Sequence, residues 1–151
     1  GTSINWFSNM LPHYNFVGFD SFIGLKEDWA GHFLPQGTFS QNGVLPKVNK
    51  NVVLVKGWFD EILPEYIEEN GIFDLRFIHI DCDTYEGAVA VFNELGDKLK
   101  PGMLILFDEL LGYPNWQNGE FKALHEAQSK NGFSFRYRAF CSHQALIEIT
   151  A

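Results

Sequence analysis

Short apolar runs alternate with helical segments along this sequence, and this alternation restricts the fold most strongly. Three of the runs lead directly into acidic side chains: 16–19 into Asp20, 75–80 into Asp81 and Asp83, and 103–107 into Asp108 and Glu109. Most of the runs are continuously apolar, which is typical of strands buried on both faces of a parallel sheet. Ligands of such sheets bind outside the carboxyl ends of the strands, so the acids lie where chemistry is expected.

The order of the predicted elements favours a doubly wound α/β fold with a mostly parallel sheet. The predicted strands cover 16–20, 51–56, 75–80, 103–107, 133–140 and 145–149, and the predicted helices cover 3–11, 60–69, 85–99 and 118–129. The last two strands are expected to form an antiparallel pair. Residues 21–50 are rich in glycine and proline, which predicts a long irregular connection.

Composition limits the class of protein. The 151 residues, 46% of them apolar, are enough for one packed domain that spans 1–151. A net charge of −8 would repel phosphate backbones and anionic lipids, which argues against nucleic acid or a membrane as the partner. No apolar run approaches the roughly 20 residues of a membrane helix, and the two distant cysteines fit a reducing, cytoplasmic setting. The aromatic content of 16% would favour self-association wherever such side chains are exposed.

The acids that follow the 75–80 and 103–107 strands are candidates for a metal site. If these strands are neighbours, Asp81, Asp83, Asp108 and Glu109 lie close together, and like charges raise one another's pKa unless a cation neutralises them. Carboxylate oxygens are suitable ligands for Mg²⁺, Ca²⁺ or Mn²⁺. The alternative is that one acid of each pair caps the helix that follows.

Other residues have two interpretations that the pattern leaves open. Asp20 would either accept hydrogen bonds from ribose hydroxyls or serve as a turn residue. His79 would act as a general base or lie buried within its strand. Trp58 and Phe59, which follow Gly57, would stack on a flat ring such as adenine or pack in the core.

Five segments in register carry a resemblance to a known family. They are 19–25 (FDSFIGL), 51–60 (NVVLVKGWFD), 77–85 (FIHIDCDTY), 101–109 (PGMLILFDE) and 113–116 (YPNW). In order and spacing they resemble the macrocin O-methyltransferase family of class I S-adenosylmethionine-dependent methyltransferases. The resemblance implies a seven-stranded sheet with its last two strands antiparallel, and S-adenosylmethionine bound over the carboxyl edge of that sheet.

The resemblance also implies residues that would contact the cofactor. Asp20 matches the acid that binds the ribose, with Ser21 beside it, and Asp81 is expected to border the cofactor as well. Two short segments complete the set: Gly1, Thr2 and Ser3 match the end of a glycine-rich loop near the methionine moiety, and Gly57, Trp58 and Phe59 fall where the adenine pocket is lined.

The same resemblance implies a metal and a base. Asp81, Asp108 and Glu109 match positions that bind Mg²⁺ in the family. The metal would hold the acceptor's hydroxyl oxygens and aim one of them at the methyl group. The general base is expected to be Asp81 or Asp83, and His79 is the next candidate.

One departure from the family concerns the first strand. In the family's fold this strand is central and precedes the glycine-rich loop, so the chain is expected to lack it. The leading prediction is a Mg²⁺-assisted O-methyltransferase that acts on a hydroxyl of a sugar or other small secondary metabolite. The alternatives are an incomplete or degenerate domain without activity, which would bind or interact only, and a glycosyltransferase with Asp81-Cys82-Asp83 as its DxD motif.

Overall fold

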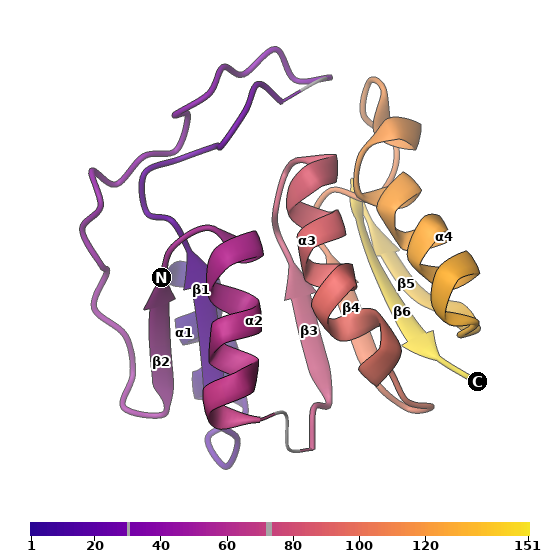
Figure 1. Cartoon of the computed structure of the whole chain (residues 1–151), viewed down its shortest axis with the longest axis horizontal. Coiled ribbons are helices and arrows are strands. Elements are labelled where there is room, and N and C mark those ends of the chain that lie inside the picture. The colour runs from indigo at the N-terminus through magenta and orange to yellow at the C-terminus, as the bar shows by residue number, and fades with distance from the viewer. Residues whose placement is uncertain (30, 72–73) are drawn as a thin grey trace.

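The computed structural model of the chain describes residues 1–29, 31–71 and 74–151. The helices are α1 (Thr2–Met10), α2 (Phe59–Asn70), α3 (Tyr85–Leu95) and α4 (Glu120–Asn131), with 3₁₀ turns η1 (Gly96–Lys98) and η2 (Trp116–Asn118). The strands are β1 (Phe16–Asp20), β2 (Val52–Lys56), β3 (Phe77–Ile80), β4 (Leu104–Phe107), β5 (Phe135–Cys141) and β6 (Gln144–Ile149). Figure 1 shows α2, α3 and α4 on one side of the strands and α1 on the other.

The strands form two separate ladders. β1 pairs in parallel with β2, whereas the other four strands make a sheet in the order β3-β4-β6-β5. β3 and β4 are parallel, and β6 is antiparallel to both β4 and β5. The α/β class and the antiparallel C-terminal pair are therefore confirmed. Within the described residues no ladder joins β1 to β3, and the expected lack of a central strand stays a prediction.

The core lies between the four-stranded sheet and the helices that cover it. Ile105 and Phe107 of β4 are fully buried, as are Ile147 and Ile149 of β6. Leu124 of α4 is also fully buried and belongs to the same hydrophobic cluster. This packing fixes the carboxyl ends of β3 and β4, which precede the predicted acids.

Side chains connect the two ladders where backbone hydrogen bonds do not. Phe7 of α1 packs against Phe77 and His79 of β3, with ring centroids 5.1 Å and 5.3 Å apart. The same helix approaches β1 closely, because a Cβ placed at Gly18 would lie only 2.8 Å from Ile4 Cδ1. α1 therefore packs against a strand of each ladder.

Two helices differ from their predicted bounds by two residues or more. The helix expected over 85–99 ends at Leu95 and continues as η1. Glycine is a poor helix former, and a Cβ at Gly96 would lie 2.5 Å from the side-chain nitrogen of Asn131. The helix expected over 118–129 begins at Glu120 and ends at Asn131, where Gly132 takes a left-handed φ of 76°.

The connection over 21–50 is irregular, as predicted. Its described residues form no helix or strand, apart from an isolated bridge between Trp29 and Leu34, and residue 30 lies outside the described part of the chain. Among the helices that the structure describes, none has the length and apolar character to cross a membrane.

Candidate functional site

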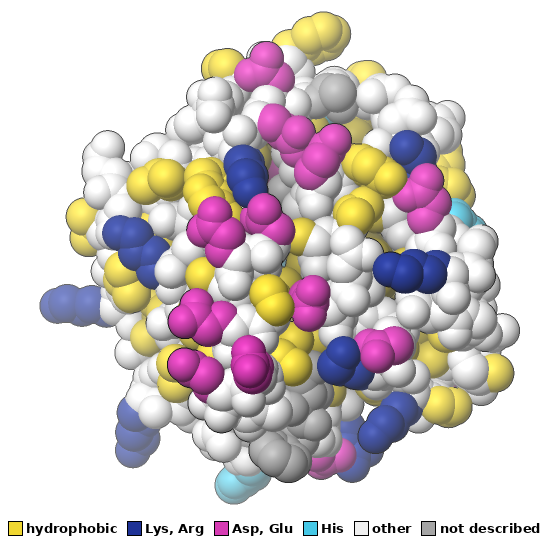
Figure 2. Space-filling model, viewed as in Figure 1, with side chains coloured by type: hydrophobic (Ala, Val, Ile, Leu, Met, Phe, Trp, Pro, Cys, Tyr) yellow, Lys and Arg dark blue, Asp and Glu magenta, His cyan; other side chains and the backbone are white. Residues whose placement is uncertain are grey.

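A cleft of about 560 Å³ opens at the carboxyl ends of β1, β2 and β3. It is lined by Asp20 and Ser21 after β1, by Gly57, Trp58 and Phe59 after β2, and by Asp81 and Asp83 after β3, together with part of α3. Most of the predicted cofactor residues therefore share one cavity with two of the predicted catalytic acids. On the face shown in Figure 2, acidic side chains gather over α2 and beyond the upper end of α3.

Asp20 ends β1 and begins a tight turn. Its Oδ1 accepts a hydrogen bond from the backbone N–H of Phe22 at 2.7 Å. The buried Ser21 hydroxyl accepts from the N–H of Ile23 and donates to the carbonyl of Gly24. Asp20 thus has the turn role that the sequence left open, and its place in the cleft keeps the ribose-binding role as a prediction.

Gly57 brings the ends of β1 and β2 together. Its N–H donates to the carbonyl of Asp20 at 3.0 Å, and a Cβ at this position would lie 2.3 Å from Ile62 Cγ2. The chain therefore requires glycine here. Trp58 follows in the cleft, with Lys26 Nζ 5.4 Å from its ring centroid, and Phe59 begins α2 while packing against the core.

Residues 1–3 are not among the residues that line the described cleft. The three are exposed, and a Cβ at Gly1 would lie 2.9 Å from Pro46 Cβ. α1 begins at Thr2 with Gly1 as its N-cap, so Ser3 lies inside the helix. Their contact with the methionine moiety stays a prediction.

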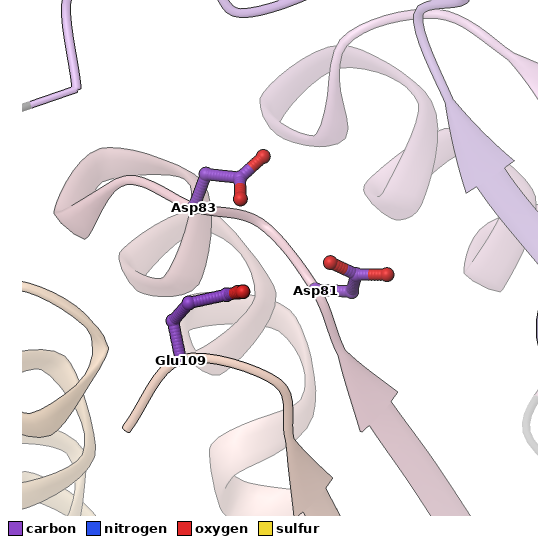
Figure 3. Close-up of side chains that lie close together, drawn as sticks. All are labelled: Asp81, Asp83 and Glu109. Carbon is purple, nitrogen blue, oxygen red and sulfur yellow. The ribbon is translucent and has the colours of Figure 1, made fainter. Parts of the chain in front are cut away.

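Three carboxylates converge next to this cleft. Asp81, Asp83 and Glu109 each offer one oxygen, and the three oxygens lie within 4.8 Å of one another. Figure 3 shows Asp81 and Asp83 on the segment between β3 and α3, and Glu109 after β4 with its carboxylate extended toward the other two. Parallel pairing of β3 with β4 produces this meeting, because it places both strand ends at one edge.

The segment that carries Asp81 and Asp83 has a sharply bent backbone. Asp83 has a φ of 63°, a left-handed conformation that few residues other than glycine, asparagine and aspartate adopt. The Thr84 N–H donates to the carbonyl of Cys82 at 2.7 Å, and the Thr84 hydroxyl caps α3 by accepting from Gly87. We call residues 81–83 the acid turn.

Burial and mutual repulsion disfavour the charged forms of these acids. Burial is the main cause that raises the pKa of Asp83 to about 7 and that of Glu109 to about 9, and the neighbouring carboxylates add to both shifts. The pKa of Asp81 is raised for the same two reasons. A buried oxygen of Glu109, Oε2, has no hydrogen-bond partner. This donor set fits a divalent cation such as Mg²⁺, which would neutralise the charges.

Asp108 lies beside this group and is engaged elsewhere. Its Oδ1 accepts a hydrogen bond from the Gln144 side chain and lies 3.9 Å from His79 Nε2. The structure therefore groups two of the predicted metal ligands, Asp81 and Glu109, with the predicted base Asp83. His79 lies between the Phe7 ring and Asp108, and its Nε2 is buried without a hydrogen-bond partner.

Two features of the site were not predicted. Glu120, the first residue of α4, is completely buried, and its Oε1 accepts a hydrogen bond from the Cys82 N–H at 3.1 Å. Burial raises the pKa of Glu120 well above its ordinary value, whereas the Cys82 N–H lowers it. The sequence offers only an acid in the first turn of a helix, which is a common surface feature.

The second feature is an aromatic group that joins the 21–50 connection to the segment after β4. The His32 ring lies 4.1 Å from Trp29 and 5.0 Å from Tyr113, measured between centroids. Burial is the main cause that raises the pKa of Tyr113 to about 12, with Glu120 and Glu109 contributing. The aromatic residues are visible in the sequence, but their meeting depends on how the long connection crosses the sheet edge.

Comparisons with known proteins agree with this arrangement. A protein family described as "Methyltransferase domain" matches residues 1–110. The solved calicheamicin methyltransferase CalS11 is 26% identical, with a TM-score of 0.69 over 89% of this chain and 60% of that one. The O-methyltransferase NovP, 19% identical, has a TM-score of 0.64 over 91% of this chain and 60% of that one, which supports the fold.

These matches also set the extent of the similarity. The chain spans about 60% of the length of the solved structures that it resembles. A search of curated proteins gives no match. The family match covers more than half of the sequence and includes the cleft and the acid turn. The chain therefore belongs to the methyltransferase-domain family.

Proposed function

We propose that this chain catalyses S-adenosylmethionine-dependent, Mg²⁺-assisted methyl transfer to a hydroxyl of a sugar or other small secondary metabolite. The observation that carries the proposal is the single cleft that contains both Asp20 and the acid turn. A second structure of CalS11, in the apo state and also 26% identical, is described as a TDP-rhamnose 3'-O-methyltransferase, which supports a sugar hydroxyl as the acceptor.

The first part of the cleft would bind the cofactor. The Asp20 carboxylate would accept hydrogen bonds from the ribose hydroxyls, because one carboxylate can pair with two vicinal hydroxyls. Trp58 and Phe59 would lie against the adenine ring. We also assign the methionine moiety to the vicinity of Gly1, Thr2 and Ser3, on the basis of the sequence resemblance.

The second part would hold the acceptor and remove its proton. Asp81 and Glu109 would bind Mg²⁺, with Asp108 beside them as the third predicted ligand. When bound, Mg²⁺ supplies Lewis-acid stabilisation of an acceptor oxygen. We assign the general base to Asp83, because one of its oxygens lies within 4.8 Å of ligand oxygens on Asp81 and Glu109. A proton from the acceptor hydroxyl would then move to a carboxylate oxygen of Asp83.

Calorimetric titration with S-adenosylhomocysteine tests the cofactor site. The Asp20→Asn variant is the informative one, because an asparagine oxygen can still accept the hydrogen bond from Phe22 that shapes the turn. We expect micromolar binding by the unaltered chain, at least a tenfold loss in Asp20→Asn, and no change in Asp97→Asn. Asp97 is an exposed acid outside the cleft and serves as the matched control.

Two results would count against the proposal. Equal binding by the unaltered chain and Asp20→Asn would remove Asp20 from the cofactor site. No binding by a folded chain would favour the alternative of a domain without activity. Titration with and without Mg²⁺, followed by a methyl-transfer assay in chelator, then tests the metal separately, because full activity in chelator would exclude a metal role.

A further inference from the structure

Glu120 connects α4 to the acid turn from inside the protein. Its carboxylate is completely buried, and Oε1 accepts the N–H of Cys82, the residue between Asp81 and Asp83. Glu120 lies 38 residues after Cys82 in the sequence, so this hydrogen bond links two distant parts of the chain. The contact therefore acts at the centre of the segment that presents both acids.

The acid turn needs such a contact to keep its shape. The left-handed φ of Asp83 is unfavourable for a residue with a side chain, and surrounding contacts must compensate for it. One flank of the turn is fixed by the Thr84 cap of α3, and the other by the Asp108 N–H, which donates to the carbonyl of Ile80. Glu120 supplies the side-chain acceptor for the N–H between these two flanks.

Burial of a carboxylate at this position costs folding free energy. The second oxygen of Glu120, Oε2, is buried and has no hydrogen-bond partner. The hydroxyl of Tyr113 is also buried without a partner, and it lies so near Gly119 that a Cβ there would be 2.4 Å from it. A leucine would fill a similar volume without an unpaired carboxylate oxygen, and the group that it would leave without a partner is the Cys82 N–H. Departures of this kind from good core chemistry are characteristic of functional sites.

We propose that Glu120 is a positioning residue, which fixes the spacing of the Asp81 and Asp83 carboxylates by holding the Cys82 N–H between them. Glu120 is not among the residues that line the cleft, so it would act through the acid turn and not by contact with the substrate or cofactor. The metal part of this inference rests on the proposed function, whereas the effect on the backbone of the acid turn does not. Outer partners of metal ligands typically change metal affinity by about 10- to 100-fold when they are lost.

The experiment compares two variants of Glu120 in the otherwise unaltered chain. Glu120→Gln keeps an oxygen that can accept the Cys82 N–H, whereas Glu120→Leu keeps the volume and removes the acceptor. Hydrogen exchange of the Cys82 amide, followed by NMR, reports on the turn. The affinity for Mn²⁺, followed by electron paramagnetic resonance, reports on the carboxylates. Ala127→Gly is the control, since it weakens α4 through lower helix propensity and the loss of one buried methyl group, at a residue that makes no contact with the Cys82 N–H.

We expect the Cys82 amide to exchange at least tenfold faster in Glu120→Leu, with Mn²⁺ affinity reduced about 10- to 100-fold. Glu120→Gln should keep the Cys82 exchange rate and the Mn²⁺ affinity of the unaltered chain, and Ala127→Gly should leave Mn²⁺ affinity unchanged. Unchanged exchange in Glu120→Leu, or equal losses in the Gln and Leu variants, would overturn the proposal. If the unaltered chain binds no Mn²⁺, the metal part of the proposed function fails, and the exchange rates still decide the role of Glu120.

Discussion

Replacement of Asp83 by asparagine should stabilise the chain when no metal is bound. The Asp83 pKa is raised from 3.8 to about 7, mainly by burial and then by the neighbouring carboxylates. Each unit of pKa shift corresponds to about 1.36 kcal/mol, so ionising this group in the folded state costs at most about 4 kcal/mol. The side chain is partly exposed and the other acids can readjust their protonation, so we expect a gain of about 1–3 kcal/mol.

The sign of the pH dependence follows from the raised pKa. Between pH 4 and pH 7 the folded state holds a proton on Asp83 that the unfolded state has released, so stability falls as the pH rises through this window. The advantage of Asp83→Asn should therefore be small at pH 4, grow up to pH 7 and stay constant above it. Asparagine also tolerates the left-handed φ of 63° at this position, so the substitution adds no backbone strain.

Urea unfolding in chelator at pH 4 and pH 8, followed by tryptophan fluorescence, measures this difference. Asp97→Asn is the control and should show a small effect of opposite sign at pH 8, because Lys98 lowers the pKa of Asp97. An Asp83→Asn chain that is no more stable than the unaltered chain at pH 8 would refute the argument. The argument would also be refuted if the stability advantage of Asp83→Asn did not grow between pH 4 and pH 8.

Three further outcomes are expected. Glu109→Gln should weaken Mn²⁺ binding at least tenfold, as measured by electron paramagnetic resonance. Asp108→Asn should weaken it less, because an oxygen of Asp108 already accepts a hydrogen bond. Equal losses of Mn²⁺ affinity in the two variants would contradict this expectation. Ile105→Ala should lower the free energy of unfolding by about 2–5 kcal/mol in urea titrations, because Ile105 is fully buried in β4, an inner strand of the four-stranded sheet. Lys26→Met should change that free energy by less than about 1 kcal/mol, since the ion pair between Lys26 and Asp60 is half exposed.

The sequence predicted the parts of this molecule that depend on local pattern. Apolar runs gave the strands, and the acids that end β3 and β4 were placed together because parallel pairing carries strand ends to one edge. The turn at Asp83 and the burial of Glu120 were not predictable, since both depend on how α4 packs against the segment after β3.

The sequence also does not show which carboxylates come together at the site. By their positions after β3 and β4 alone, Asp83 and Asp108 are equal candidates for the metal site, and only side-chain packing separates them. Gln144 of β6, which lies 36 residues beyond Asp108 in the sequence, engages Asp108, so Asp83 joins Asp81 and Glu109 instead. Resemblance to a family extended the prediction to cofactor contacts. The comparisons support the methyltransferase domain, and the contacts themselves stay predictions.

The separation of the two strand ladders has a mechanical consequence for the proposed methyl transfer. Asp20, on the proposed donor side, belongs to the β1–β2 pair, and the acid turn, on the acceptor side, follows the four-stranded sheet. Hydrogen bonds resist sliding within each ladder, whereas packed rings such as Phe7 against Phe77 yield more readily to shear. In the proposed reaction, the distance between the methyl donor and the acceptor oxygen would therefore depend on how α1 packs against both ladders, although this helix contributes no side chain to the cleft.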